Sequence, residues 1–127
     1  MAIHRLEIPD WLPSSINDLM RMHFHARNRL LKGEAELVAV YFLLAKIPQA
    51  EGKRRVTLTF AAPGVGGGRG AKVGDVDNRL KGLLDSLVKC GGLVDDAPAW
   101  MELGEIRAER GLKRTTIVLE DLEGDRE

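Results

Sequence analysis

Five aspartates lie close together between residues 74 and 96, in the stretch GDVDNRLKGLLDSLVKCGGLVDD. They are Asp75, Asp77, Asp85, Asp95 and Asp96. Neighbouring carboxylates repel one another, so either their pKa values rise or a cation neutralises them. Oxygen ligands of this kind are what Mg²⁺ accepts in proteins, where it also keeps several waters. The stretch therefore predicts a divalent metal site, and the alternative is an ordinary capped helix beside an acidic loop.

The middle of this stretch has the spacing of an amphipathic helix. Apolar side chains recur at intervals of three and four residues, at Leu80, Leu83, Leu84, Leu87 and Val88. This pattern predicts a helix from about Asp77 to Lys89. Asp77, Lys81 and Asp85 then form a stripe away from the leucines, where Lys81 can pair with either carboxylate. Asp75 precedes the helix in chain expected to be extended, where a period of two puts residues 75 and 77 on the same side.

The residues after the helix are expected to complete the acidic cluster. Gly91 and Gly92 predict a turn, and the apolar pair at 93 and 94 predicts a short strand that runs back. Asp95 and Asp96 would then return near the first two acids. The sequence alone leaves open which of them binds the metal.

The rest of the chain predicts a sheet and a second helix. Alternating apolar residues predict strands at residues 3–8, 55–62, 100–110 and 113–121, with the last two joined as a hairpin at Gly111. A helix that ends near Pro48 and covers the sheet is predicted by apolar residues at helical spacing, Leu30, Leu31, Leu37, Val38, Tyr41, Leu44 and Ala45. Together these elements predict the α/β (α+β) class, a single domain whose mixed β-sheet has two main helices packed on it and a C-terminal β-hairpin.

Length and composition limit the class of protein. A chain of 127 residues can form one domain with a buried core, expected over residues 1–119, before an acidic and flexible tail at residues 120–127. Cys90 is the only cysteine, which excludes an internal disulfide and indicates a reduced, cytoplasmic setting. The longest apolar run covers nine residues, 37–45, whereas a membrane span needs roughly 20, so no membrane association is expected.

The zero net charge hides an uneven distribution. The tail holds five acids and one base, so residues 1–119 carry 18 bases against 14 acids, a net charge of +4. Without the five clustered aspartates the balance is 18 bases against 9 acids, which suits a polyanion if a bound cation neutralises those aspartates. The alternative is a solvated surface of mixed sign, and the basic run at residues 53–55 is interpreted in that way.

The acidic stretch resembles the signature of the RusA family of Holliday-junction resolvases, which runs D-x-D-N-x-x-K, then D-x-L, then G, then D-D. The matching residues, in register without a gap, are Asp75, Asp77, Asn78, Lys81, Asp85, Leu87, Gly91, Asp95 and Asp96. A weaker likeness lies in SIND, at residues 15–18, together with Arg21. The stretch DDAPAW departs from the family, because it lacks the polar residue that usually follows the second aspartate by two positions.

The resemblance implies a Mg²⁺-dependent endodeoxyribonuclease that resolves four-way DNA junctions by paired, symmetric nicks through phosphodiester hydrolysis. The residues that it assigns to catalysis and metal binding are Asp75, Asp77, Lys81 and Asp96, with Asp95 as an alternative metal ligand. Lys81 would place its ammonium against the charge that develops on the phosphate, and Asp85 would orient that lysine or cap the polar face of the helix. The sequence leaves open whether Mn²⁺ can replace Mg²⁺.

Candidate DNA contacts lie in three parts of the chain. The parts that carry the resemblance contribute Asn17, Arg21 and Asn78. A glycine-rich segment at residues 63–74 carries Arg69 and Lys72, and its small residues would let a backbone phosphate approach closely. An idle loop is the alternative for that segment.

Other functions stay open at this point. They are a junction-binding protein of the same fold that does not cut, a nuclease for flaps or forks, and a sugar-nucleotide transferase that uses the D-x-D motif. The transferase needs more room than 127 residues give. A four-way junction has two-fold symmetry and one chain supplies one acidic site, so we expect a homodimer, with the N-terminal strand and the glycine-rich side of the sheet as the first places to look for its interface. The expected location is a bacterial cytoplasm, with a bacterial or phage gene.

Overall fold

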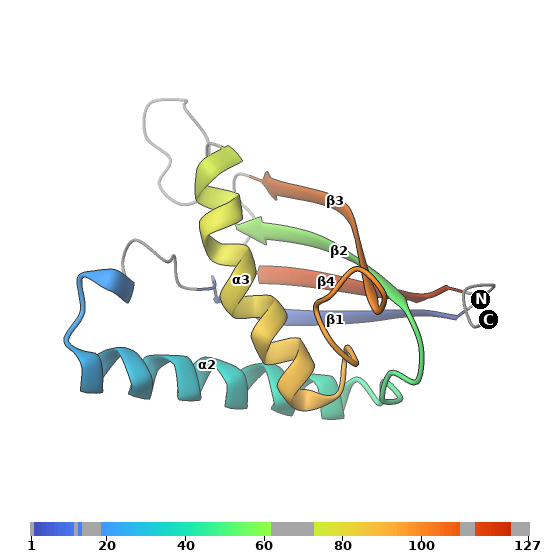
Figure 1. Ribbon diagram of the computed structural model, residues 1–127, viewed down its shortest axis with the longest axis horizontal. Helices are drawn as coiled ribbons and strands as arrows, with labels where there is room; N and C mark the ends of the chain where they lie inside the picture. The colour runs from blue at the N-terminus through green and yellow to red at the C-terminus, as the bar shows by residue number, and fades with distance from the viewer. Residues whose placement is uncertain (1, 12, 14–18, 62–72, 110–113, 123–127) are drawn as a thin grey trace.

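The computed structural model describes residues 2–11, 13, 19–61, 73–109 and 114–122, and of residues 61, 73–79, 108 and 109 it describes the backbone alone. The elements follow in the order β1 (Ile3–Pro9), α2 (Phe24–Leu44), β2 (Arg54–Ala61), α3 (Val73–Cys90), β3 (Met101–Glu109) and β4 (Arg114–Asp121). Figure 1 shows the strands as one layer, with α3 crossing in front of it and α2 running along the side of β1. The predicted α+β class, a mixed sheet with two helices, is confirmed.

Across the sheet the strands are ordered β1, β4, β2, β3. β4 pairs antiparallel with β1 and β2, whereas β2 pairs parallel with β3. The two predicted C-terminal strands are present and run in opposite directions, but β2 lies between them, so they share no ladder of hydrogen bonds. β4 suits an interior position because Thr115, Thr116 and Ile117 are all buried, whereas Leu103 of β3 is exposed at the edge. Among the described strands, β1 and β3 are the two edges, and the N-terminal strand is therefore an edge strand as expected.

The core forms between one face of the sheet and the apolar side of α3. Val56, Leu58 and Phe60 alternate along β2 and are buried, as the sequence pattern predicts. Leu83 and Leu87 of α3 are buried in the same cluster. Burial of each such side chain stabilises the fold by about 1.5–3 kcal/mol. The apolar face of α3 is thus confirmed, and it fixes which side of the helix remains open to solvent.

α2 packs mainly against α3, and its main contact with the sheet is at β1. The prediction that this helix covers the sheet is therefore too broad, because α3 occupies that position (Figure 1). Its buried side chains are Val38 and Phe42, one helical turn apart. Leu44, which was predicted to lie on the buried face, is 69% exposed. Phe42 is larger and lies one turn from Val38, so it takes the inward position.

The segment at residues 91–100 contains no strand, so the predicted short strand at residues 93 and 94 is wrong. Gly91 ends α3 in the left-handed conformation, with φ of 93°. The backbone amides of Gly92 and Leu93 then donate to Leu87 O at 2.8 and 3.2 Å. These bonds turn Leu93 into the core, where it is buried, and leave Val94 exposed. Neither residue is therefore part of a β-strand.

The C-terminal end of the described chain is part of the sheet. Glu120 and Asp121, which the sequence analysis assigned to the tail, lie in β4, and both form ion pairs with arginines of β2. Residues 123–127 lie outside the described part of the chain. Neither helix, as far as the chain is described, has the length and apolar character that crossing a membrane requires.

Candidate functional site

α3 carries the first two acids of the candidate site. The helix begins at Val73, so Asp75 and Asp77 both lie within it, and the predicted extended conformation at Asp75 is wrong. Two positions two residues apart on an α-helix are separated by about 200° around the axis, so they do not share a side. The first turns of the helix were missed although Val73 and Val76 lie seven and four residues before Leu80 and so continue its apolar repeat. The side chains of Asp75, Asp77 and Asn78 are outside the described set, and their metal site stays a prediction.

Lys81 and Asp85 follow on the solvent side of α3. Both are exposed, opposite the buried Leu83 and Leu87. Neither forms an ion pair or hydrogen bond with another described residue, so the expected orientation of Lys81 by Asp85 is not formed. A lysine one turn before an acid is the weaker of the two arrangements on a helix, which accounts for the missing pair. The Lys81 ammonium is consequently open to an external anion.

The two acids after α3 differ in the hydrogen bonding of their carboxylates, which the sequence alone does not indicate. Asp95 and Asp96 are both exposed. The Asp95 carboxylate accepts a hydrogen bond from the backbone amide of Asp96, at 2.8 Å. The Asp96 carboxylate has no such partner among the described residues. Asp96 therefore has the carboxylate that is more available for an external cation.

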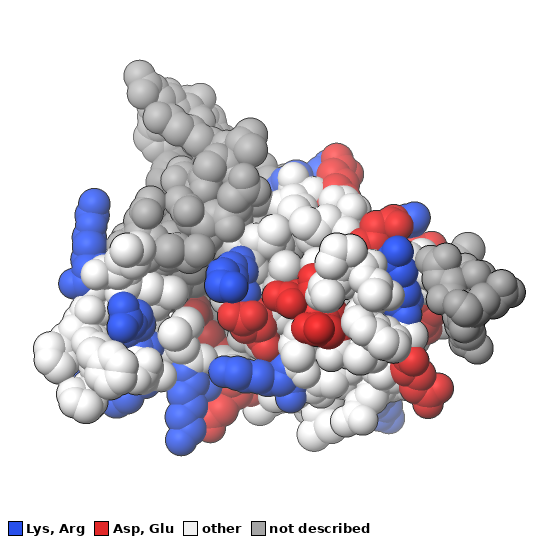
Figure 2. Space-filling view, viewed as in Figure 1, with Lys and Arg blue, Asp and Glu red and all other residues white. Residues whose placement is uncertain are grey.

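Figure 2 shows acidic side chains gathered near the middle of one face, over α3 and the segment that follows it, with basic side chains beside them. The described acids of these two parts of the chain are Asp85, Asp95 and Asp96. Within the described side chains, no three histidine, cysteine or acidic groups lie close enough to hold a metal ion. The side chains of Asp75 and Asp77 are not among these, and the metal site stays a prediction.

The candidate DNA contacts are spread over the chain. Arg21 is exposed in a turn just before α2. Asn17, Arg69 and Lys72 lie outside the described residues, and Asn78 is described only through its helical backbone. Arg21 is thus the one member of this set whose exposure the structure describes, and exposure is what a phosphate contact requires.

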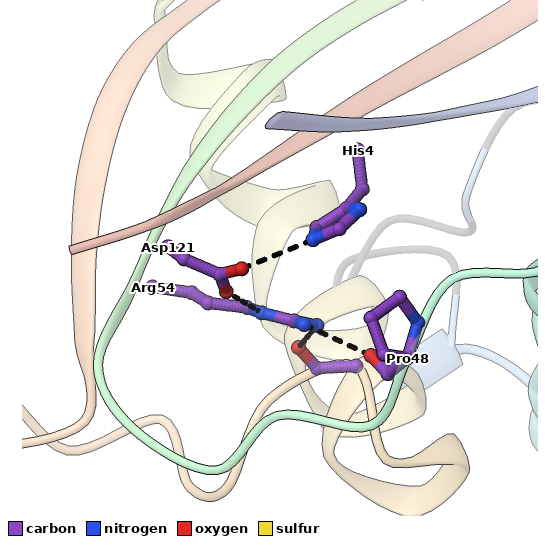
Figure 3. Close-up of polar contacts among 5 residues, drawn as sticks. His4, Pro48, Arg54 and Asp121 are labelled. Atoms are coloured by element: carbon purple, nitrogen blue, oxygen red, sulfur yellow. Dashed lines mark hydrogen bonds and ion pairs between the residues drawn. The ribbon is translucent and has the colours of Figure 1, made fainter. Parts of the chain in front are cut away.

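Sequence reasoning missed a buried polar group at Arg54. The basic run at residues 53–55 was interpreted as solvated, yet the Arg54 side chain is only 2% exposed. Its Nε donates to Asp121 Oδ1 at 2.6 Å, its Nη1 to Gly92 O at 3.0 Å and its Nη2 to Pro48 O at 2.9 Å. Figure 3 shows this group between β2, β4 and the chain at Pro48. The missed signal was the alternation of β2, which places residue 54 on the same side as Val56.

Asp121 balances the charge of Arg54. Its other oxygen, Oδ2, lies 3.1 Å from His4 Nε2 of β1 (Figure 3). Desolvation alone would raise the pKa of the Asp121 carboxyl, but the hydrogen bonds and charges of Arg54 and His4 outweigh it, so that pKa lies below its ordinary value. The carboxylate is therefore held in its ionised form where β1, β2 and β4 meet.

The chain was compared with known proteins. No family model matches it, and no curated protein matches it. The likeness to the RusA family consequently rests on the residue pattern of this chain, chiefly on the motif at residues 75–96.

Proposed function

We propose that this protein is a Mg²⁺-dependent, structure-selective endodeoxyribonuclease that resolves four-way DNA junctions by paired, symmetric nicks. The observation that carries the proposal is the exposed polar side of α3 with the acid pair that follows it. Lys81 is exposed and unpaired among the described residues, and the Asp96 carboxylate is likewise open. Both belong to a segment that matches the RusA signature in register, which gives these residues their roles.

The donor chemistry of this segment fits Mg²⁺. Asp75, Asp77 and Asp96 would hold the ion, with Asp95 as the alternative ligand, and all four supply the hard oxygen atoms that Mg²⁺ prefers. The hydrogen bond that Asp95 accepts from the Asp96 amide favours Asp96 as the direct ligand. A bound Mg²⁺ would neutralise the scissile phosphate and lower the pKa of a coordinated water, so that hydroxide is available near neutral pH.

Lys81 has a separate role in this proposal. Its ammonium lies on the solvent side of a helix whose other side is locked into the core by leucines. A cation held on a rigid element can stabilise charge that develops on the phosphate during cleavage without having to reorganise. Arg21, Asn17, Asn78, Arg69 and Lys72 are the proposed contacts to the DNA backbone.

The proposed working unit is a homodimer on branched DNA in a bacterial cytoplasm, encoded by a bacterium or a phage. Two opposed strands of a junction must be nicked, and each chain supplies a single acidic stretch. β1 is an edge of the described sheet and is the first candidate for the interface. Light scattering with and without junction DNA tests this part, and a monomer that resolves junctions fully would contradict it.

Cleavage assays test the proposed activity. Labelled four-way junction, duplex and single strand are incubated with the purified protein in Mg²⁺, in Mn²⁺ and in chelator. We expect cleavage of the junction alone and only with metal, and no cleavage by Asp96→Asn prepared in the same way. Junction binding without cleavage under every metal condition would instead identify a non-cutting binding protein. Preferred cutting of flaps or forks would identify a different nuclease.

A further inference from the structure

We infer that Arg54 is a positioning residue for the acid pair at Asp95 and Asp96, which is a deeper statement about the proposed nuclease site and rests on that function. Arg54 lies on β2 and belongs to neither α3 nor the acidic segment. Its buried side chain contacts the segment at residues 91–100 through Gly92 O, whereas the two acids are exposed. It would therefore act through the backbone and not by touching metal or DNA.

One residue holds both ends of the acid-bearing segment. The Nη1 atom of Arg54 donates to Gly92 O at 3.0 Å, before the acids, and its backbone amide donates to Trp100 O at 3.1 Å, after them. Asp95 and Asp96 thus project from a chain whose two ends are bonded to a single buried residue. A short irregular segment fixed at both ends has less conformational freedom to lose when its carboxylates bind a ligand.

We call the two bonds from Arg54 to Gly92 O and Trp100 O the clamp. Further bonds near the two ends of the segment support it. Gly91 O accepts from the Ala50 amide at 2.8 Å, and Leu93 is 2% exposed within the core. At the far end, Ala97 O accepts from the amides of Trp100 and Met101, at 2.8 and 3.0 Å. Only a short stretch between these bonded ends consequently remains, and it contains Asp95 and Asp96.

The guanidinium chemistry explains why arginine occupies this position. Its three contacts join β4, the segment before β2 and the segment after α3, and they use all three nitrogens of the fork. A lysine could neutralise Asp121 but has one nitrogen, so it cannot reach three acceptors spread around a planar fork. Arg54→Lys should therefore keep the charge balance while loosening the hold on Gly92.

Two matched variants separate positioning from plain stability. Asp121→Asn removes the charged partner of Arg54 Nε and leaves the acceptors at Gly92 O and Trp100 O in place, so it measures the cost of losing stability alone. Arg55→Lys makes the identical change one residue along β2, where the arginine pairs with Glu102 and Glu120. We expect Arg54→Lys to raise the Mg²⁺ concentration for half-maximal junction cleavage about tenfold or more, with unchanged junction binding in chelator, as for loss of an outer support of a metal site. Both controls should stay close to the unmodified protein in that Mg²⁺ requirement.

A measurement on the unmodified protein covers the case in which Arg54→Lys does not fold. Backbone ¹⁵N relaxation should give order parameters near 0.85 for the amides of residues 94–96, as in rigid backbone, although these residues are exposed and outside any helix or strand. Order parameters below about 0.6 there would overturn the inference. So would an Arg54→Lys protein whose Mg²⁺ requirement changes no more than that of Asp121→Asn. Absence of any cleavage by the unmodified protein would refute the proposed function, while rigid amides would still support the clamp.

Discussion

Two basic side chains of this fold occupy opposite environments. Arg54 is 2% exposed and donates to three acceptors, whereas Lys81 is exposed and has no partner among the described residues. Removing a guanidinium from water is costly unless its donors are satisfied, so a buried arginine joins the segments that satisfy it. An exposed ammonium costs little when left unpaired and remains open to an anion. Two side chains of the same charge therefore differ in what they can contact, because Arg54 faces the buried side of the sheet and Lys81 faces solvent.

The carboxylates divide in the same way. Asp121 is paired with Arg54 and His4 at the meeting of three strands. Asp96 has an exposed carboxylate without a described partner. The first contributes to holding the sheet together, and the second is available to an external cation.

The largest effect is expected from the acids of α3. Asp77→Asn would remove a charged metal ligand and abolish junction cleavage, while junction binding stays equal or tightens because the protein repels phosphate less. Asp85→Asn removes the same charge further along the helix and should leave most of the cleavage. Cleavage rate and junction affinity are measured on the same preparations. A parallel loss of cleavage and binding in Asp77→Asn would contradict the metal site.

The next effect concerns Arg54, the buried basic residue. Arg54→Met places an apolar side chain at this position and leaves Asp121 Oδ1, Gly92 O and Pro48 O without the donors that Arg54 supplies, so we expect a loss of about 3 kcal/mol in the free energy of unfolding. Arg55→Met, on the opposite face of β2, should cost clearly less because that arginine is 40% exposed. Urea denaturation followed by circular dichroism gives both values. Equal losses of unfolding free energy in the two variants would show that the burial of Arg54 does not add to the stability of the fold.

Substitution of Lys81, the exposed basic residue, should affect cleavage and leave the stability of the protein unchanged. Lys81→Ala is expected to lower the cleavage rate by about 10²-fold, as for removal of a transition-state contact. Lys89→Ala, at another exposed lysine of α3, is the matched control and should cut normally. Thermal unfolding of both variants should match the unmodified protein. Near-normal cleavage by Lys81→Ala would mean that this lysine is only a surface residue of the helix.

The smallest effect is a pH dependence of stability at Asp121. The pKa of Asp121 in the folded protein lies below its ordinary value of 3.8. The ionised carboxylate therefore contributes fully to the free energy of unfolding above pH 3.8, and this contribution is lost as the pH falls through the pKa of the folded protein. The difference in unfolding free energy between the unmodified protein and Asp121→Asn should therefore shrink in acid. Denaturation curves from neutral pH down to acid check this. A difference that stays constant or grows in acid would contradict the paired carboxylate.

Alternation and helical spacing were enough to predict the four main strands and the inward side of α3. Leu83 and Leu87 of α3 are buried as their spacing indicates. The order of strands was not accessible, because local pattern does not report which strands become neighbours, and β2 separates β3 from β4. The start of α3 was misplaced because Gly74, Asp75 and Asp77 have low helix propensity and suit a helix cap, although Val73 and Val76 extend the apolar repeat of Leu80.

The candidate site was predictable in its residue types and less so in its arrangement. The motif identified Lys81, Asp95 and Asp96, all of which are exposed. The hydrogen bond from the Asp96 amide to Asp95 depends on how the segment turns, which no periodicity encodes. Arg54 was missed for a related reason, since its partners at Gly92 and Asp121 are remote in sequence and are brought together only by the fold.

Mapping the nicks on a four-way junction tests the central claim most directly. Each of the four strands is labelled in turn, and the products formed with and without Mg²⁺ are resolved at single-nucleotide length. We predict nicks at symmetric positions on two opposed strands, formed only with Mg²⁺ and absent with Asp96→Asn. Intact strands in a junction that the protein binds, or nicks confined to one strand, would contradict a junction-resolving nuclease.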